Sequence, residues 1–133
     1  MRKDKIVKLI KKAQEATKYS YAPYSKFRVG ACVLSENGNF FTGCNVENCS
    51  YGLTVCAERV AIFKTISEGE RPIAIAIYLA DSEDYAYPCG ACRQVMAEFG
   101  NLTVIIAKSE SKWIEKKLDE LMPLAFSPDA LQK

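Results

Sequence analysis

The sequence of 133 residues contains no histidine. This absence excludes every catalytic arrangement in which an imidazole activates a serine or a cysteine, and it excludes a metal site with imidazole ligands. Any chemistry must therefore use cysteine, carboxylate, lysine or tyrosine side chains, or a metal ion that such side chains bind.

Long hydrophobic runs and concentrated charge are also missing. No run approaches the about 18 apolar residues of a membrane helix, and the N-terminus lacks the apolar segment of a secretory signal peptide. We therefore expect a protein of the reducing cytoplasm that does not bind membranes. The net charge is only +2, and the lysines between Met1 and Lys18 are separated by apolar residues. Nucleic-acid-binding proteins usually carry a basic stripe, so we expect no nucleic-acid partner.

Apolar residues make up 49% of the chain, which is enough for one hydrophobic core, and we expect residues 1–133 to form a single domain. Hydrophobic periodicity predicts helices over Lys3–Lys18, Val55–Glu68 and Cys89–Phe99, and strands over Arg28–Leu34, Phe40–Cys44, Ile73–Ala80 and Leu102–Ala107. The dipeptide Asn37-Gly38 predicts a tight hairpin turn between the first two strands. The later strand–helix–strand order predicts a right-handed parallel crossover.

The segment from Lys112 to Met122 fits two structures. Its apolar residues permit a helix, but they also permit a short strand over Lys112–Leu118 that is followed by one helical turn. Only Ser109-Glu110-Ser111 separates this segment from the preceding strand. Three residues cannot form a parallel crossover, so a strand here would have to be antiparallel.

Three of the six cysteines stand at predicted helix starts. Cys56 and Glu58 begin one helix, and Pro88-Cys89-Gly90-Ala91-Cys92 begins the next. Zinc prefers four tetrahedral ligands, and a set of three protein ligands leaves one position for water, which is typical of a catalytic site. Helix N-termini also favour the thiolate form that a metal requires. We therefore expect Cys56, Cys89 and Cys92 to hold one zinc ion per chain.

Polar neighbours complete this expected site. Glu58 is positioned to carry protons between a zinc-activated water and a substrate. Three thiolates and one Zn²⁺ sum to a charge of −1, so hydrogen-bond donors should withdraw charge from the sulfurs. Arg59 is the first candidate for this role and Gln94 a weaker one.

Simpler interpretations stay open for these residues. A closed structural site would take Cys44 or Cys49 as a fourth thiolate, and a Cys-x-x-Cys pair alone also suits a dithiol redox site. Glu58 could be an ordinary carboxylate at a helix start, and Arg59 could form a surface ion pair. The cysteines outside the zinc set are most simply small apolar side chains that fill the core.

Four motifs in order resemble the small homotetrameric cytidine deaminases. They are Tyr24-Ser25-Lys26-Phe27-Arg28-Val29-Gly30-Ala31, Asn45-Val46-Glu47-Asn48, Cys56-Ala57-Glu58-Arg59 and Pro88-Cys89-Gly90-Ala91-Cys92-Arg93-Gln94. The resemblance implies an α/β fold, a three-layer α-β-α sandwich. Its mixed sheet would have about five strands, with an antiparallel hairpin at each end of a parallel core and helices on both faces. It also favours the strand over Lys112–Leu118.

The resemblance further implies hydrolytic deamination of cytidine or deoxycytidine to uridine or deoxyuridine, with release of ammonia, as in pyrimidine salvage. Phe27 would stack on the base, and Asn45 and Glu47, with Val46 between them, would bind the ribose. The Ala57 amide would hold the ring carbonyl oxygen, and the Tyr87 carbonyl would receive the leaving amine. Tyr51 would line the site, and Phe126 would reach into the site of a neighbouring subunit in a homotetramer with shared active sites.

Three other functions fit parts of the same pattern. A deaminase of a cytosine-containing antibiotic such as blasticidin S shares the motifs around Cys56 and Cys89. A non-catalytic binding module stabilised by zinc would have a closed metal site. A nucleic-acid-editing domain would bind single strands with strong salt dependence, and the short connection before Lys112 argues against it. A small nucleoside substrate is the expectation that uses all four motifs.

Overall fold

A five-stranded mixed sheet forms the centre of the protein in the computed structural model, which describes residues 1–131. In the strand order β2-β1-β3-β4-β5, only the β3–β4 pair is parallel. The strands are β1 (Val29–Ser35), β2 (Phe40–Cys44), β3 (Pro72–Leu79), β4 (Thr103–Ser109) and β5 (Lys112–Lys117). The α-helices are α1 (Lys3–Ala16), α2 (Ala57–Ser67), α3 (Gly90–Ala97) and α4 (Leu118–Leu121).

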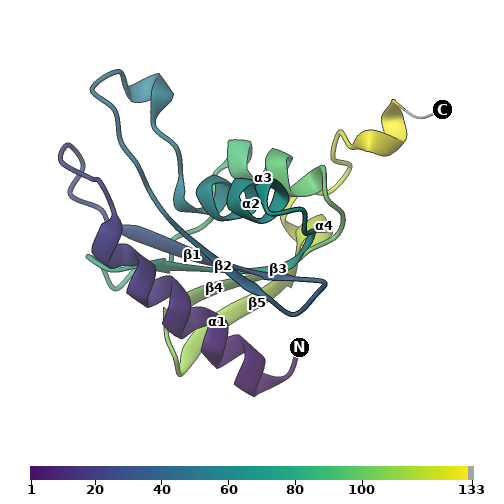
Figure 1. Ribbon diagram of the computed structural model, residues 1–133, viewed down its shortest axis with the longest axis horizontal. Helices are drawn as coiled ribbons and strands as arrows, with labels where there is room; N and C mark the ends of the chain where they lie inside the picture. Colours follow the sequence, from purple (N-terminus) through teal and green to yellow (C-terminus); the bar gives the residue numbers. More distant parts are fainter. Residues whose placement is uncertain (132–133) are drawn as a thin grey trace.

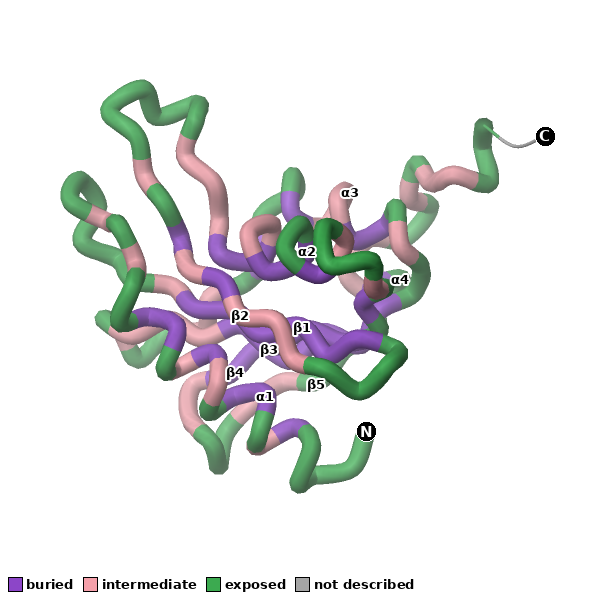
Figure 2. The backbone as a smooth tube through the Cα atoms, in the orientation of Figure 1, coloured by how far each residue is buried: buried purple, intermediate pink, exposed green. Residues whose placement is uncertain are grey.

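Helices cover both faces of this sheet, as Figure 1 shows. Helix α1 packs on one face around Leu9, Ile10 and Cys32, all fully buried. Helices α2 and α3 pack on the other face around Ile62, Met96 and residues of β3 and β4. The buried residues are concentrated in the central strands and the helix faces that meet them, while the loops at the molecule's ends are exposed (Figure 2). The predicted three-layer sandwich is confirmed.

The connections follow the turn chemistry of the sequence. Asn37-Gly38 joins β1 to β2 in a tight hairpin, and Gly38 has the positive φ of 86° that favours glycine. Helix α3 makes the crossover between the parallel strands β3 and β4. Strands β4 and β5 pair antiparallel across a two-residue turn, so the strand interpretation of Lys112–Leu118 is confirmed, with one helical turn, α4, after it.

Two glycines set how closely the helices approach the sheet. A Cβ atom at Gly30 would lie 1.9 Å from the carbonyl oxygen of Ala13 in α1. A Cβ atom at Gly43 would lie 2.6 Å from the carbonyl oxygen of Ala57, the first residue of α2. Real Cβ atoms do not approach backbone this closely, so both contacts depend on glycine.

Helix boundaries differ from the predictions by one to two residues at most ends. Helix α1 ends at Ala16 because the chain tightens into a 3₁₀ turn at Thr17–Tyr19. Helices α2 and α3 begin one residue after Cys56 and Cys89, which both have extended backbones and act as N-caps. Frayed or tightened ends of this kind are common in helices.

Two loops project together from one end of the sheet, and the C-terminal segment projects elsewhere (Figure 1). The loop before β1 and the loop after β2 meet at a parallel bridge between Tyr21 and Val46. The described C-terminal residues form a 3₁₀ turn, Pro128–Ala130, that extends away from the sheet. None of the helices in residues 1–131 combines the length and the hydropathy that crossing a bilayer requires.

Candidate metal centre

The sulfur atoms of Cys56, Cys89 and Cys92 meet at the starts of α2 and α3. The Sγ atoms of Cys56 and Cys89 are 3.8 Å apart, those of Cys89 and Cys92 are 3.5 Å apart, and all three lie within 4.8 Å of one another. A disulfide would join its sulfurs at about 2.05 Å. Tetrahedral zinc–thiolate bonds of about 2.3 Å place pairs of sulfurs about 3.8 Å apart. The donor set and its spacing therefore fit a zinc ion.

The local fold explains why these sulfurs converge. Cys56 and Cys89 are the N-caps of α2 and α3, and Cys92 lies in the first turn of α3. Both helices direct their positive dipole ends and unpaired N–H groups at the same point. Cys44 and Cys49 do not join the group within residues 1–131, so the closed four-thiolate alternative finds no support in the described residues.

The pKa values of the Cys56 and Cys92 thiols are shifted in opposite directions. Hydrogen bonds from the Cys92 thiol, and then from the Arg59 guanidinium and the Cys89 thiol, lower the pKa of Cys56 to about 5. The pKa of Cys92 is raised because its proton bridges to Cys56 and because the side chain is buried. Metal binding requires thiolates and releases their protons. The lowered pKa favours the thiolate form of Cys56, which metal binding requires.

Arg59 makes the contact that its predicted role requires. Its Nη2 atom donates a hydrogen bond to Cys56 Sγ over 3.6 Å, and the same contact raises the pKa of the guanidinium. Its Nε atom is buried without a hydrogen-bond partner among the described residues. A buried donor of this kind is costly unless it faces negative charge. Arg59 is therefore placed to withdraw charge from a thiolate cluster.

Glu58 lies one residue beyond Ala57 in the first turn of α2, and its side chain is 4% exposed. Burial raises the pKa of Glu58 to about 7, and the neighbouring Cys56 thiolate acts in the same direction. A carboxyl group with a pKa near neutrality can both accept and return a proton. An ordinary solvated carboxylate at a helix start would not have this environment.

A cavity of about 180 Å³ opens beside Glu58 and the sulfurs. Its lining contains six predicted site residues, together with Val29, Thr54 and Ala86, which sequence reasoning did not single out. The predicted residues that line it are Asn45, Cys56, Ala57, Glu58, Tyr87 and Cys89. Each missed residue is a near neighbour in sequence of a predicted one, which is the signal that could have found it. A ligand in this cavity would contact the Glu58 side chain and two of the three clustered cysteines.

Comparison with known proteins places this arrangement in a family. Residues 3–108 match the family model "Cytidine and deoxycytidylate deaminase zinc-binding region". A cytidine deaminase of Sporosarcina psychrophila is 44% identical over 128 residues, covering 95% of this chain and 94% of the relative. The chain belongs to the cytidine deaminase family.

Solved structures agree with this membership. The crystal structure of a cytidine deaminase from Burkholderia pseudomallei superposes with a TM-score of 0.83 at 44% identity, covering 90% of this chain and 97% of that chain. That of a cytidine deaminase from Mycobacterium tuberculosis gives a TM-score of 0.79 at 39% identity, covering 90% and 94%. The cysteine triad found in the geometry fits one zinc ion, in agreement with the zinc-binding region of the cytidine deaminase family.

Asn45 and Glu47 hold backbone in this member of the cytidine deaminase family. Asn45 is buried; its Nδ2 donates to the Phe27 carbonyl over 2.7 Å, and its Oδ1 accepts from the Val29 N–H over 3.0 Å. The Glu47 carboxylate accepts the N–H groups of Tyr24 and Ser25 and the Ser25 hydroxyl. The Ser25 hydrogen bond lowers the pKa of Glu47. Both residues therefore shape the loop that carries Phe27.

Other residues expected from the resemblance lie outside the cavity lining. Phe27, Val46, Tyr51 and Phe126 are exposed, and the Tyr51 ring contacts Tyr24 edge-on with centroids 6.0 Å apart. The backbone N–H and carbonyl of Val46 both bond Val55. Their predicted contacts with a substrate stay predictions.

Gln94 and Cys49 depart from their predicted surroundings. Gln94 donates its amide hydrogen to the Phe126 carbonyl over 2.8 Å, so the structure gives it a different partner from the predicted thiolates. Cys32 is buried in the core as predicted, whereas Cys49 is exposed in the loop after β2, so its prediction as a core filler was wrong. This loop is held by polar contacts, and a small thiol in it needs no apolar surroundings.

Proposed function

We propose that this protein hydrolyses cytidine, and with it deoxycytidine, to uridine or deoxyuridine and ammonia. One observation carries the proposal: a buried carboxyl group, Glu58, lines a cavity together with Cys56 and Cys89, two members of a group of three sulfurs at the spacing of zinc ligands. Membership of the cytidine deaminase family supports it.

Residues of the chain perform the proton transfers. Zinc, when bound by the three cysteines, supplies the Lewis acidity that makes water a nucleophile near neutral pH. Glu58 takes a proton from that water and delivers it to the pyrimidine ring nitrogen beside the amine-bearing carbon. A second proton transferred through Glu58 goes to the exocyclic amine, which leaves as ammonia. Its raised pKa, about 7, suits a group that must both accept and return protons.

Backbone groups can orient the pyrimidine. Ala57 is the first residue of α2, where the helix provides no acceptor for its N–H, and it lines the cavity. This N–H suits the ring carbonyl oxygen of the base. Tyr87 also lines the cavity, and its carbonyl oxygen suits the departing amine. A backbone contact of this kind does not depend on the Tyr87 side chain.

The loops around the cavity suit the ribose and the face of the base. Asn45 lines the cavity and keeps one amide hydrogen beyond the one bonded to Phe27, so it can donate to a ribose hydroxyl. Glu47 lies two residues further along the same extended segment. Phe27 follows the turn that Glu47 holds, and its exposed ring is available to stack on the base.

We further propose that the active unit is a homotetramer with shared active sites. Leu124, Phe126 and Leu131 expose large apolar side chains on a C-terminal segment that extends away from the sheet (Figure 1). Exposed apolar side chains of this size indicate a surface that another chain covers.

We also propose that the protein works in the cytoplasm. The cysteines are all free thiols, the state expected in that reducing compartment.

A steady-state assay on protein of measured zinc content tests the function. We expect about one zinc per chain and release of ammonia from cytidine and deoxycytidine. Blasticidin S and single-stranded DNA serve as comparison substrates. Turnover of blasticidin S or of DNA cytosine in preference to both nucleosides would contradict the proposal, and so would zinc-loaded protein that turns over none of them.

A further inference from the structure

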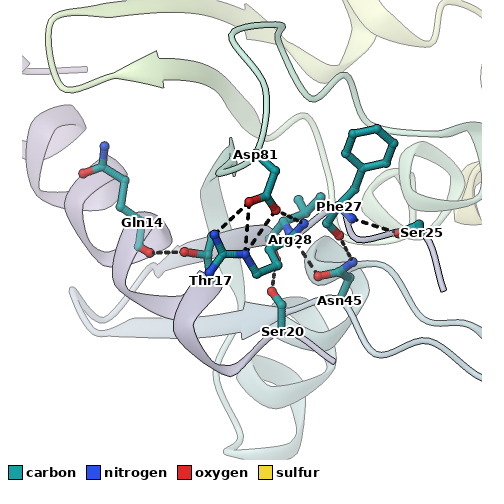
Figure 3. Close-up of polar contacts among 9 residues, drawn as sticks. Gln14, Thr17, Ser20, Ser25, Phe27, Arg28, Asn45 and Asp81 are labelled. Carbon is teal, nitrogen blue, oxygen red and sulfur yellow. Dashed lines mark hydrogen bonds and ion pairs between the residues drawn. The ribbon is translucent and has the colours of Figure 1, made fainter. Parts of the chain in front are cut away.

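The ion pair between Arg28 and Asp81 joins two segments that border the cavity, and neither residue takes part in the proton transfers of the proposed reaction. The Arg28 Nη2 and Nε atoms donate to Asp81 Oδ1 over 2.7 and 3.2 Å, and Nε also lies 3.1 Å from Oδ2. The backbone N–H of Arg28 donates to Asp81 Oδ2 over 2.8 Å. Figure 3 shows this forked contact, in which one carboxylate binds both the guanidinium and the main chain of the same residue.

The contact stands where two paired strands separate. The Ala80 N–H still donates to the Arg28 carbonyl over 2.9 Å, continuing the antiparallel pairing of β1 with β3. At the next position the Asp81 carboxylate, instead of a backbone carbonyl, accepts the Arg28 N–H. Beyond this point the segment that precedes Arg28 leads back to Phe27, and the segment that follows Asp81 enters the loop 82–88. The ion pair therefore sets the geometry at which the two segments diverge.

Each diverging segment supplies a part of the cavity's surroundings. Val29, directly after Arg28, lines the cavity, and Phe27 directly precedes Arg28. The loop that Asp81 begins carries Ala86 and Tyr87, which also line the cavity, and it ends at the zinc ligand Cys89. A shift of Asp81 relative to Arg28 would therefore change the separation between these two walls.

A second side chain holds the Arg28 segment from another direction. Asn45 bonds the Phe27 carbonyl and the Val29 N–H, while Asp81 bonds the Arg28 N–H between them (Figure 3). Within residues 1–131, the Asn45 side chain bonds only residues of the segment 27–29, so it does not connect this segment to the loop 82–88. The Asp81 fork supplies that tie, and the hydrogen bond from Arg28 keeps the pKa of Asp81 below its usual range.

The chemistry of the pair favours a role in geometry over one in stability. The Arg28 side chain is 49% exposed and that of Asp81 28%, and exposed ion pairs contribute little to folding. An Arg–carboxylate fork nevertheless fixes orientation in a way that a lysine cannot, because its donors are planar and rigidly spaced.

We propose that Arg28 and Asp81 are a positioning pair that sets the distance between Phe27 and the Ala86–Tyr87 wall, and so determines how tightly the pyrimidine nucleoside is held. This inference rests on the proposed function, because the nucleoside is the ligand that the two walls would enclose. Neither residue touches the reacting atoms.

Kinetics of four variants test the proposal. Asp81→Asn, Arg28→Gln and the double variant should each raise KM for cytidine about fivefold and leave kcat within about twofold, since interactions that bind ground state and transition state alike change KM alone. The double variant should match the single variants, because either change removes the ion pair between the two side chains. Arg28→Lys should show an intermediate KM. Asp4→Asn, which breaks the exposed pair between Arg2 and Asp4, is the matched control.

A second measurement reads the positioning without substrate. Hydrogen exchange of peptides covering residues 26–30 and 80–88 should be faster in Asp81→Asn than in the wild type, while exchange in α1 stays unchanged. The visible spectrum of the cobalt-substituted protein should not change, because the metal ligands keep their places.

The outcomes separate the two proposals. Wild-type turnover of cytidine with an unchanged KM in Asp81→Asn overturns the positioning role and leaves the function intact. An equal loss of kcat in the variants, with an altered cobalt spectrum, also overturns it and indicates general structural damage. If the wild type does not deaminate cytidine, the proposed function fails, and unchanged exchange would then overturn the positioning role separately.

Discussion

At the scale of single residues, the environment of Glu58 separates a reactive carboxyl group from an ordinary one. Many helices begin with an acidic residue that faces solvent and favours the helix dipole. Glu58 is instead buried beside thiol groups, and burial raises its pKa to about 7. The helix position alone was visible in the sequence, and the burial required the sheet, α2 and α3 together.

Replacing Glu58 by Gln should remove turnover while leaving the metal in place. We expect kcat for cytidine to fall about 10²- to 10⁴-fold, because an amide cannot accept and return a proton. Zinc content, measured by atomic absorption, should stay at the wild-type value. Glu68→Gln, at the exposed opposite end of the same helix, is the control and should keep full activity. A Glu58→Gln enzyme with wild-type kcat would exclude the proton-transfer role.

Arg59 offers a test of charge withdrawal from the sulfurs. Arg59→Gln removes the donor to Cys56 Sγ, and we expect zinc affinity to fall about 10- to 100-fold, as is typical when a partner of a metal ligand is lost. Competition with a chelator measures this affinity. Arg59→Lys keeps the positive charge but not the planar donors, so its zinc affinity should lie between those of the wild type and Arg59→Gln. Equal affinities in all three proteins would show that Arg59 does not act on the metal site.

At the scale of secondary-structure elements, the zinc ligands depend on how closely α2 approaches the sheet. Gly43 of β2 faces the backbone of Ala57 and Ala61, so α2 rests directly on the strand. Because Cys56 and Glu58 stand at the start of this helix, any displacement of α2 moves both residues of the proposed site together.

Gly43→Ala should therefore affect stability and the site at once. The added methyl group would lie 2.5 Å from Ala61 N and 2.6 Å from Ala57 O, so the helix must move. We expect a loss of about 1–3 kcal/mol in the free energy of unfolding, seen as a fall of about 3–10 °C in Tm, with weaker zinc retention. Gly52→Ala, where a Cβ meets no atom within 4 Å, is the stability control. Equal Tm values for the two variants would contradict the close contact.

The secondary structure could be predicted from the sequence where the apolar residues fit either the helix period or the strand period, but not both. Phe40–Cys44 was predicted with its observed bounds because the turn Asn37-Gly38 fixes where the strand begins. Lys112–Lys117 was ambiguous, since Trp113, Ile114 and Leu118 satisfy both the helix and the strand period. The short turn before it, which permits only antiparallel pairing with β4, resolves the ambiguity in the folded protein.

At the scale of the whole molecule, the C-terminal segment has too few contacts to explain its apolar side chains. Phe126 is 61% exposed and Leu124 fully exposed, while Gln94 holds the Phe126 carbonyl near α3. A segment that is anchored through its backbone and exposes its side chains is suited to contact a second copy of the chain.

We expect Phe126→Ala to raise KM for cytidine several-fold and to weaken assembly. Light scattering should give the wild type a mass about four times the 14.8 kDa of the chain. The variant should show a smaller average mass at low concentration, because an exposed aromatic anchor of the interface is lost. Tyr19→Ala, an exposed aromatic residue outside this segment, is the control. A monomeric wild type with full activity would refute the shared-site assembly.

The grouping of Cys56, Cys89 and Cys92 could be predicted from the sequence alone, and so could the place of Glu58 at the same helix start. Cys56 with Glu58, and Cys89 with Cys92, are each separated by two or three positions, so local helix geometry already places each pair together. The absence of histidine excludes the competing imidazole chemistries by composition alone.

Only the tertiary structure decided which distant residues meet. Arg28 and Asp81 are 53 positions apart, and Gln94 and Phe126 are 32 apart. Their contacts depend on the order of strands in the sheet and on where the chain leaves it, which no local pattern encodes. For the same reason the sequence could name Asn45 as a site residue but could not show that it holds the backbone on both sides of Arg28.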